Sequence, residues 1–248
     1  MLDSVIQLNE VDSTNNYLRR MIEQSKDALP QGFSVYSKYQ TAGRGQIGNA
    51  WISERGKNLL ASILIYPKHI AIHDQFYISK AVSVAVIDAL KSLFIEHSSS
   101  FYIKWPNDIY INDKKIAGIL IEHTLSVHQI KYSIIGIGLN VNQKNFSKKI
   151  PNPTSVFLET AQQFDVEQLC NAIINQLKKW KNTDRETLLG QYNQLLYRKE
   201  KFCQYVDKRG DKTIFAKIIG IDKFGRLLLM DTDNNTTTFE LNEISYII

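Results

Sequence analysis

The chain has 248 residues, of which 44% are apolar, so it is long enough for one large domain or for a large domain and a small one. Its 30 basic and 25 acidic residues leave a net charge of +5, which suits anionic ligands or an acidic protein partner but is too diffuse to indicate DNA binding. Cys170 and Cys203 have no partners at metal-ligand spacing, and the sequence shows neither a signal peptide nor an apolar run of roughly 20 residues, so we expect a cytoplasmic protein with reduced thiols.

The first predicted element is a helix that begins around Asp12-Ser13-Thr14-Asn15. Apolar residues then follow at helical spacing: Tyr17, Leu18, Met21 and Ile22. Ser13 and Thr14 are residue types that cap helices, and capping alone is the simpler interpretation of them. Hydroxyls and an amide grouped at a helix N-terminus can also bind a polar ligand, so Ser13, Thr14 and Asn15 are candidate binding residues.

A strand over 33–39 leads into a glycine-rich loop over 40–51. Three glycines of this loop have the G-x-G-x-x-G spacing of dinucleotide-binding sites: Gly43, Gly45 and Gly48. That fingerprint also requires a following helix and an acidic residue about 20 positions later, and this sequence has neither. No Gly-Lys-Ser/Thr sequence of a P-loop follows, so the sequence argues against both a nicotinamide oxidoreductase and a P-loop enzyme.

Two interpretations of the glycine-rich loop remain. It is a mobile surface loop, or it is a lid whose glycines let the backbone close over a ligand. In the second interpretation, Arg44 would meet anionic oxygens and Trp51 would offer a flat face for stacking.

The next predicted elements are a buried strand over 57–66, a core helix over 79–94 and a short strand over 101–105. Apolar residues alternate in the short strand, so Lys104 lies on the face opposite to them. The proline that follows ends the strand because it has no N–H to donate. The stretch Lys104-Trp105-Pro106-Asn107-Asp108 therefore holds a fixed positive charge beside a polar turn, where it can meet a phosphate or a carboxylate.

A hairpin follows, in which 109–111 pairs with 116–122 across a turn over 112–115. The strand after it, 132–142, has one apolar face and one face of glycine and asparagine: Gly136, Gly138, Asn140 and Asn142. Glycine weakens a strand interior, so two glycines on one face indicate that another group approaches this backbone closely. That group is either a ligand or a packed helix, and this strand alone favours neither.

Towards the C-terminus the pattern changes from helices to short strands. Asp165 and Asp184 cap two helices that carry apolar stripes. From about Tyr197 the chain reads as a small β module with strands over 212–219, 227–230 and 237–241. So small a module buries little surface alone, and we expect it to dock on the main domain. The expected division is a main domain over 1–195 and a β domain over 196–248.

Four separated stretches together resemble the biotin–protein ligases. They are Asp12-Ser13-Thr14-Asn15, Tyr39 to Trp51, Lys104 to Asp108 with Ile116 to Leu120, and Gly136 to Asn142. Each motif alone is weak, but four in this order are specific, and they lie within residues 8 to 142. The resemblance implies an α+β fold: a mixed β-sheet flanked by helices, similar to class II aminoacyl-tRNA synthetases, followed by a small SH3-like β-barrel.

The resemblance also implies a reaction in two steps. Biotin is activated with ATP to biotinyl-5′-AMP, and the biotin is then transferred to a lysine of a biotin carboxyl carrier protein domain. Mg²⁺ would arrive on the phosphates of ATP, with no dedicated metal site in the protein.

Site residues are carried over from the family position by position. Lys104 and Arg44 are the expected catalytic residues, because fixed cations stabilise charge at a carboxylate and a phosphate. The expected biotin-binding residues are Ser13, Thr14, Asn15, Gln40, Gly43, Arg44, Gly45, Gln46, Lys104, Gly118, Gly136 and Gly138. The expected nucleotide-binding residues are Trp51, Asn107, Lys115 and Asn140.

The glycine-rich loop departs from the family pattern, which has arginines where this chain has Gln46 and Asn49. Two cations for phosphates are therefore missing, and the candidate replacements are Lys57, Lys114 and Lys115. The missing arginines keep a non-catalytic biotin sensor open as an alternative function. A lipoate or octanoate ligase or transferase is a second alternative because it shares the broad fold.

The resemblance also bears on partners. The chain starts at the catalytic domain, so we expect no winged-helix DNA-binding domain, no DNA binding and no repressor function. No membrane contact is expected. A monomer and a homodimer both fit the sequence.

Overall fold

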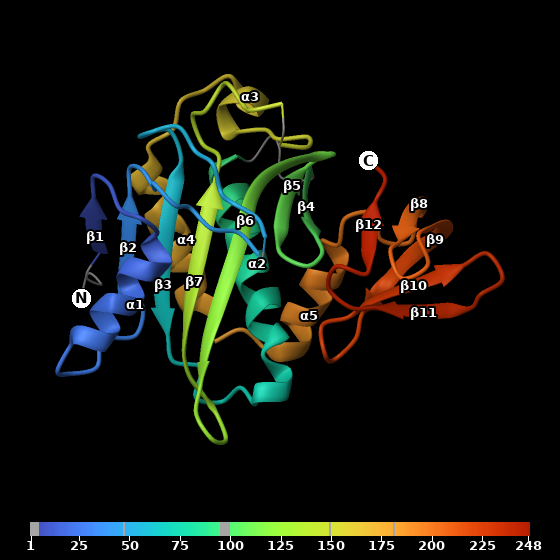
Figure 1. Ribbon diagram of the computed structural model, residues 1–248, viewed down its shortest axis with the longest axis horizontal. Helices are drawn as coiled ribbons and strands as arrows, with labels where there is room; N and C mark the ends of the chain where they lie inside the picture. The colour runs from blue at the N-terminus through green and yellow to red at the C-terminus, as the bar shows by residue number, and fades with distance from the viewer. Residues whose placement is uncertain (1–4, 47, 95–99, 149, 181) are drawn as a thin grey trace.

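The computed structural model describes residues 5–46, 48–94, 100–148, 150–180 and 182–248. Within them the chain forms a seven-stranded sheet and a five-stranded sheet (Figure 1). The larger sheet consists, in spatial order, of β1 (Val5–Leu8), β2 (Ser34–Ser37), β3 (Leu59–Ile65), β7 (Ile130–Leu139), β6 (Lys114–Leu125), β5 (Asp108–Ile111) and β4 (Phe101–Lys104). Only β1 and β2 pair in parallel among these strands, so the sheet is mixed.

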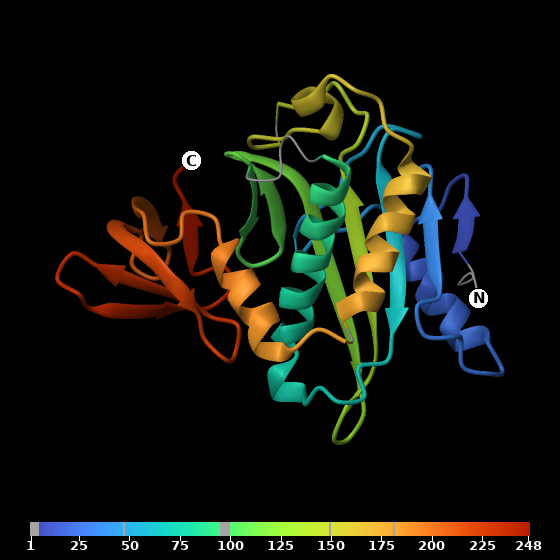
Figure 2. The same ribbon diagram turned by 180° about the vertical axis from the view of Figure 1, so that it is seen from behind.

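The smaller sheet is the predicted β module at the C-terminus. In spatial order it consists of β11 (Thr236–Phe239), β10 (Leu227–Asp231), β9 (Lys212–Ile221), β8 (Phe202–Asp207) and β12 (Ile244–Tyr246). All its neighbouring strands are antiparallel. The module sits beside the β4–β5 edge of the larger sheet (Figures 1 and 2).

Helices cover both faces of the larger sheet. α1 (Thr14–Gln24) lies on one face, and α2 (Phe76–Leu93) and α4 (Val166–Trp180) lie on the other, as the two opposite views show (Figures 1 and 2). α5 (Arg185–Gln194) packs on α2, which is buried along nearly its whole length because helices and sheet enclose it. The short elements η1 (Ile72–Asp74) and α3 (Val156–Thr160) lie in the connections.

The period of two along β7 separates the main core from the opposite face. Ile135, Ile137 and Leu139 are at most 2% exposed and pack in the core that includes α2 and α4. Gly136 and Gly138 face the other way, on the side of the sheet where α1 lies. The predicted division of this strand into two faces is confirmed.

The β module docks on the sequence stretch that carries the predicted active-site lysine. The Trp105 indole N–H donates a buried hydrogen bond to the Gly225 carbonyl oxygen, with 2.8 Å between the two heavy atoms. Ile103 in β4 exchanges backbone hydrogen bonds with the segment after α5: its N–H donates to the Leu195 carbonyl at 2.7 Å, and its carbonyl accepts from the Tyr197 N–H at 2.9 Å. The expected docking is therefore confirmed, and the module is in direct contact with this edge of the main sheet.

Most of the predicted elements are present. The strands over 33–39 and 57–66, the core helix and the three predicted strands of the β module all form, with shifted ends. The α+β class, with a mixed sheet flanked by helices, is confirmed. The strands β1, β8 and β12 were not predicted, and the domain boundary at residue 195 stays a prediction. No helix in the described ranges has the length and apolar character needed to cross a membrane.

The prediction of a four-residue turn over 112–115 is wrong. Ile111 pairs directly with Lys114, so the turn consists of Asn112 and Asp113 alone. Asn112 has a φ of 51°, the left-handed conformation that two-residue hairpin turns require and that asparagine tolerates. The correction matters for the site, because it moves Lys115 from a turn into strand β6.

Candidate functional site

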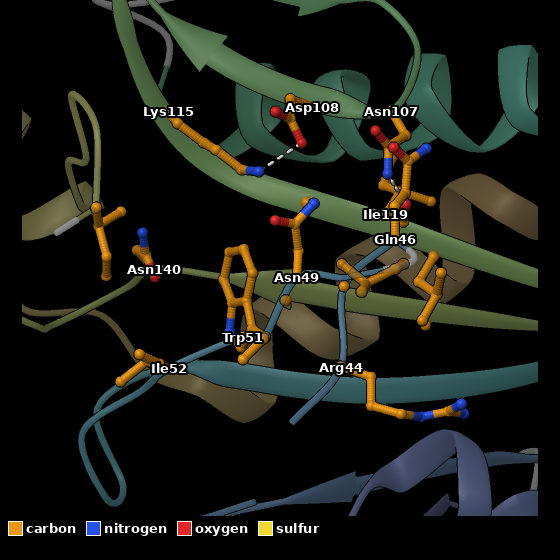
Figure 3. A pocket seen from close by; sticks show the side chains of 18 of the residues that line it. Arg44, Gln46, Asn49, Trp51, Ile52, Asn107, Asp108, Lys115, Ile119 and Asn140 are labelled. Atoms are coloured by element: carbon orange, nitrogen blue, oxygen red, sulfur yellow. Dashed lines mark hydrogen bonds and ion pairs between the residues drawn. The ribbon is translucent and has the colours of Figure 1, made fainter. Parts of the chain in front are cut away.

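A cavity of about 770 Å³ lies on the α1 side of the larger sheet. Its walls come from the start of α1, the glycine-rich loop, β6, β7 and the turn after Lys104 (Figure 3). The predicted residues that line it are Ser13, Thr14, Asn15, Gln40, Arg44, Gly45, Gln46, Trp51, Lys104, Asn107, Lys115, Gly118, Gly136, Gly138 and Asn140. Four stretches far apart in sequence therefore meet at one site, as their shared resemblance requires.

One side of the cavity is a hydrogen-bonded polar wall formed by Thr14, Asn15, Gln40 and Ser62. The Thr14 N–H and hydroxyl both donate to the Gln40 side-chain oxygen, at 2.8 and 3.1 Å. The Ser62 hydroxyl lies 2.8 Å from the Thr14 hydroxyl oxygen and 2.5 Å from the Asn15 side-chain oxygen. Ser62 is fully buried and Thr14 and Asn15 are 3% exposed, so the wall is rigid and presents fixed donors and acceptors.

The capping interpretation of Ser13 is wrong. Ser13 occupies the N-cap position of α1 in an extended conformation, but its side chain makes no capping hydrogen bond. The residue lines the cavity instead and is 3% exposed. A polar side chain that is buried at a helix start without capping it is free to serve a ligand.

The polar wall continues to Glu122 on β6. The Asn15 side-chain N–H donates to Glu122 at 2.7 Å, and the guanidinium groups of Arg19 and Arg44 each lie 3.0 Å from the same carboxylate. Burial raises the pKa of the Glu122 carboxyl, but the hydrogen bonds from Asn15 and Arg19 and the charge of Arg44 outweigh it and hold that pKa below its ordinary value. Glu122 is therefore a carboxylate whose partners include the loop arginine.

The glycine-rich loop folds back on itself and lays Trp51 across β7. The backbone N–H of Trp51 donates to the Gly43 carbonyl at 3.0 Å, and the backbone N–H of Gly45 donates to the Asn49 carbonyl at 2.8 Å. A Cβ atom at Gly138 would lie 2.4 Å from the Trp51 indole, so the ring rests on bare backbone. The close approach that the glycine face predicted is thus made by Trp51, together with the Asn15 side chain over Gly136.

Gly43 is the one predicted site residue in the described chain that does not line the cavity. The prediction that it contacts the ligand is therefore not supported by its position. A Cβ atom at Gly43 would lie 2.4 Å from the Trp51 carbonyl oxygen, so glycine allows the two arms of the loop to pair closely. Gly43 shapes the loop that carries Arg44 and Trp51.

Two lysines of the site differ in their surroundings. The Lys115 ammonium lies 2.6 Å from an Asp108 carboxylate oxygen and 5.8 Å above the Trp51 ring, so it projects into the cavity (Figure 3). The Lys104 ammonium lies 4.5 Å from the centre of the Tyr246 ring and 5.4 Å from that of Tyr110. Burial lowers the pKa of the Lys104 ammonium, and the charge of Asp108 opposes this only in part.

The three lysines that were expected to replace the missing loop arginines differ in their position relative to the cavity. Lys115 lines the cavity, whereas Lys57 and Lys114 do not. Lys57 is exposed, and Lys114 is paired with Glu159 at 3.2 Å. Lys115 is therefore the one of the three that can meet a phosphate in the cavity.

Two predicted amides hold the site's backbone. The Asn140 side-chain N–H donates to the Thr154 carbonyl at 2.9 Å, and that of Asn107 donates to the Ile119 carbonyl. The first bond fixes the loop that follows β7, and the second fixes the turn after Lys104 against β6. The hydrogen bonds of both side chains thus hold the backbone in place, and both residues also line the cavity.

Comparison with known proteins identifies the family of the chain. Residues 8–140 match the biotin/lipoate A/B protein ligase family. The chain belongs to this family. It is similar to the bifunctional ligase/repressor BirA of Escherichia coli, with 31% identity over 232 residues that cover 91% of this chain and 69% of BirA. It is also similar to the biotin–[acetyl-CoA-carboxylase] ligase of Mycobacterium tuberculosis, with 27% identity over 62% of this chain and 57% of that protein.

Solved structures of the family share the whole fold. The biotin protein ligase from Aquifex aeolicus in complex with biotin and ATP has a TM-score of 0.77 and 26% identity. The match covers 99% of this chain and 98% of that one, so it includes both sheets. The expected mixed sheet flanked by helices, followed by a smaller β domain, is therefore confirmed.

Several residues of this ligase-family site were missed in the sequence. Ser62 and Glu122 complete the polar wall, Asp108 pairs with Lys115, and Tyr246 reaches Lys104 from the β module. Asp108 lies inside the Lys104–Asp108 motif and could have been found there. Ser62, Glu122 and Tyr246 stand in ordinary strand patterns, and only the tertiary fold brings them into contact with the lining residues Asn15 and Lys104.

The donor set of the cavity fits a magnesium ion that is carried by phosphates. Among the described residues, no cluster of three or more His, Cys, Asp or Glu side chains forms a metal site, and Asp108 is the one acidic residue that lines the cavity. Mg²⁺ is usually held by one or two carboxylates together with phosphates and water. A single carboxylate suits that mode and does not suit a site made by protein ligands alone.

Proposed function

We propose that this chain activates biotin with ATP to biotinyl-5′-AMP and transfers the biotin to a lysine of a biotin carboxyl carrier domain. The observation that carries the proposal is the cavity in which all four motifs of the family meet. Membership of the family and the fold shared with a biotin- and ATP-bound ligase support it. Biotin, ATP and Mg²⁺ are the substrates and ion that this function requires.

In the first step, a carboxylate oxygen of biotin attacks the α-phosphorus of ATP, and pyrophosphate leaves. In the second step, the carrier lysine, as a neutral amine, attacks the carbonyl carbon of the mixed anhydride. An amide bond forms, AMP leaves, and the amine gives up a proton. Both steps need cations near the carboxylate and the α-phosphate, because negative charge builds up there in the transition state.

The polar wall is the proposed site for the biotin head group, which is a cyclic urea with one carbonyl and two N–H groups. Ser13, Thr14, Asn15 and Gln40 offer the hydroxyl and amide groups that such a ring requires. Gly136 lets the Asn15 side chain lie directly against the strand, since a Cβ atom there would lie 2.6 Å from the Asn15 oxygen. The remaining biotin contacts that we propose are Gly45, Gln46 and Gly118.

For the reacting phosphate, the geometry favours Lys115 over Lys104 as the main cation. The Lys115 ammonium stands in the cavity beside Trp51, and its pairing with Asp108 holds it there. Lys104 also lines the cavity, but its ammonium lies 5.4 Å from the centre of the Tyr110 ring and 4.5 Å from that of the Tyr246 ring, so part of its charge interacts with these rings. We therefore assign Lys115 to direct charge stabilisation and Lys104 to the support of the turn that carries Asp108.

The adenine base is proposed to stack on Trp51. The indole rests on Gly138 and Gly118, where Cβ atoms would lie 2.4 and 3.0 Å from the ring. The indole N–H of Trp51 is buried and has no hydrogen-bond partner within the described chain, so a donor is available at this end of the cavity. Asn107 and Asn140 fix the backbone around the base, and the loop that carries Trp51 keeps water from the anhydride.

Mg²⁺ would enter with ATP. When bound, it would neutralise part of the phosphate charge, and Asp108 is the carboxylate that can reach it. Asp108 also orients Lys115, so the same carboxylate would interact with the Lys115 ammonium and with Mg²⁺.

The partner of the second step is proposed to be a carrier domain, with no role for DNA or a membrane surface. Cys170 and Cys203 are free thiols, which suits a reducing compartment such as the cytoplasm. Lipoate or octanoate transfer is the competing function within the same family. The Lys104–Asp108 motif and the biotin ligases among the relatives favour biotin.

The test is to incubate the purified chain with biotin, MgATP and a biotin carboxyl carrier domain, and to follow the mass of the carrier. We expect a mass increase of one biotin and release of pyrophosphate that depends on biotin. A parallel reaction with lipoate and its own carrier domain tests the competitor. Pyrophosphate release with lipoate alone would refute the choice of biotin, and tight biotin binding without adenylate would indicate a sensor.

A further inference from the structure

Glu122 joins two parts of the site that are otherwise separate. Its carboxylate binds Asn15 in the polar wall and Arg44 in the glycine-rich loop, with Arg19 of α1 as a third partner. Gly118, Leu120 and Glu122 alternate along one face of β6, and the first two line the cavity. Glu122 therefore lies just beyond the edge of the cavity, next to residues that a ligand would touch.

The contact with Asn15 fixes which way its amide points. An ionised carboxylate can only accept hydrogen bonds, so the amide N–H₂ of Asn15 must face Glu122. The amide oxygen then faces the Ser62 hydroxyl, at 2.5 Å. Without Glu122, nothing at that end of the amide would distinguish its oxygen from its nitrogen, and the polar wall would lose a defined donor and acceptor pattern.

The contact with Arg44 ties down the loop. The backbone of Arg44 pairs with that of Ala50 in an antiparallel β-bridge across the loop. An ion pair that holds Arg44 therefore also restrains the arm of the loop that leads to Trp51. Figure 3 shows the Arg44 side chain directed away from Trp51 and Lys115. The Arg44 side chain is 39% exposed and the Glu122 side chain is 22% exposed, so the pair is partly shielded from solvent. A charge-assisted bond of this kind is stronger than an exposed ion pair.

We propose that Glu122 is a positioning residue that couples the biotin head-group site to the loop. One carboxylate sets the Asn15 amide and holds the Arg44 guanidinium, so an ordered polar wall and a closed loop favour each other. The inference rests on the function proposed above and extends it: Glu122 touches neither substrate and acts through Asn15 and Arg44. Its loss should weaken biotin binding and speed the escape of biotinyl-5′-AMP.

The test uses Glu122→Gln, which keeps the shape of the side chain and removes its charge. We expect biotin binding to weaken by about tenfold, as the loss of a hydrogen bond to a charged group would give. We also expect biotinyl-5′-AMP to dissociate faster and trypsin to cut the loop sooner in the presence of biotin. Glu122→Asp, which keeps the charge, should recover part of each effect.

A double-mutant cycle separates this role from a structural one. If the tether acts through Arg44, the dissociation rate of biotinyl-5′-AMP in Arg44→Ala should change little when Glu122→Gln is added. The matched control is Asp207→Asn in the β module, which removes another arginine-paired carboxylate, at 2.9 Å from Arg209, away from the cavity. It should leave both ligand readouts unchanged, whatever it does to the melting temperature.

The outcomes are distinguishable. If the wild-type chain neither binds biotin nor forms adenylate, the proposed function is wrong. If the wild type is active but Glu122→Gln binds biotin and retains adenylate as the wild type does, the coupling is wrong. Additive effects of Arg44→Ala and Glu122→Gln on adenylate dissociation would also overturn it, because independent effects do not pass through one ion pair.

Discussion

Replacing Gly138 by alanine should selectively weaken nucleotide binding. The added methyl group would lie 2.4 Å from the Trp51 ring, whereas carbon atoms in contact stay about 3.5–4.0 Å apart, so the ring must withdraw by about 1 Å or more. The backbone at Gly138 does not have the positive φ that would by itself exclude alanine. The strand should therefore remain intact while the stacking face moves.

The size of the effect follows from the contact that is lost. Stacking of a base on an aromatic side chain is worth about 1–3 kcal/mol, so ATP binding should weaken by about 5- to 150-fold. Gly136→Ala should instead weaken biotin binding and leave ATP binding largely unchanged. Its methyl group would lie 2.6 Å from the Asn15 oxygen and would disturb the polar wall. The proposed site thus predicts opposite ligand selectivity for two glycines of one strand.

Isothermal titration calorimetry can separate the two effects. Biotin is titrated alone, and MgATP is titrated in the presence of an alcohol analogue of biotin that cannot be adenylated. Gly190→Ala in α5 is the matched control, because its methyl group meets nothing within 4 Å and alanine favours a helix by about 0.5–1 kcal/mol. Unchanged ATP affinity in Gly138→Ala would refute the role of Trp51. Equal losses of both ligands in both variants would refute the division of the strand.

Two further predictions concern the packing of the chain. Trp105→Phe removes the buried bond to the Gly225 carbonyl, and we expect it to destabilise the chain by about 1–3 kcal/mol, seen as a lower melting temperature; an unchanged value would show that this bond does not anchor the β module. Burial raises the pKa of the Cys170 thiol to about 12, so at pH 8 a maleimide should label Cys203 and leave Cys170 unreacted until the chain unfolds; equal labelling of both in the native state would contradict this.

The sequence predicted the parts of the fold that local pattern controls. The alternation in β4 and β7 and the apolar stripe of α2 depend on residues a few positions apart, so the pattern was visible in the chain. β12 was missed because it has three residues and is held by its pairing with β8 rather than by its own pattern. β1 similarly exists as an edge strand beside β2.

The candidate site shows the same limit. Ser13, Asn15 and Gly138 could be singled out because they stand in motifs with unusual composition. Glu122 follows a run of apolar residues in β6 and resembles any strand-end carboxylate, although three partners from elsewhere in the chain converge on it. Its importance depends on contacts across 107 residues of sequence to Asn15 and 78 to Arg44, which no local pattern encodes.

The choice between the two lysines turns on such long-range contacts. In the sequence, Lys104 stood on a rigid strand beside a polar turn, and Lys115 was expected in a turn. The structure shortens that turn, places Lys115 in β6 beside Asp108, and brings the Tyr246 ring from a distant strand to 4.5 Å from the Lys104 ammonium. Both lysines line the cavity, so the preference for Lys115 that we propose rests on its place beside Asp108 and Trp51.

Lys115→Ala should therefore reduce biotin-dependent pyrophosphate release by about 100-fold or more, the usual cost of removing one transition-state donor. Lys104→Ala should cost less in this step and more in melting temperature, since it removes the ammonium that lies near the Tyr110 and Tyr246 rings. Lys114→Ala is the matched control, because its side chain points to Glu159 outside the cavity, and its rate should equal that of the wild type. A Lys104→Ala variant that folds normally yet loses adenylation as fully as Lys115→Ala would refute this preference and give the central role to Lys104, which also lines the cavity.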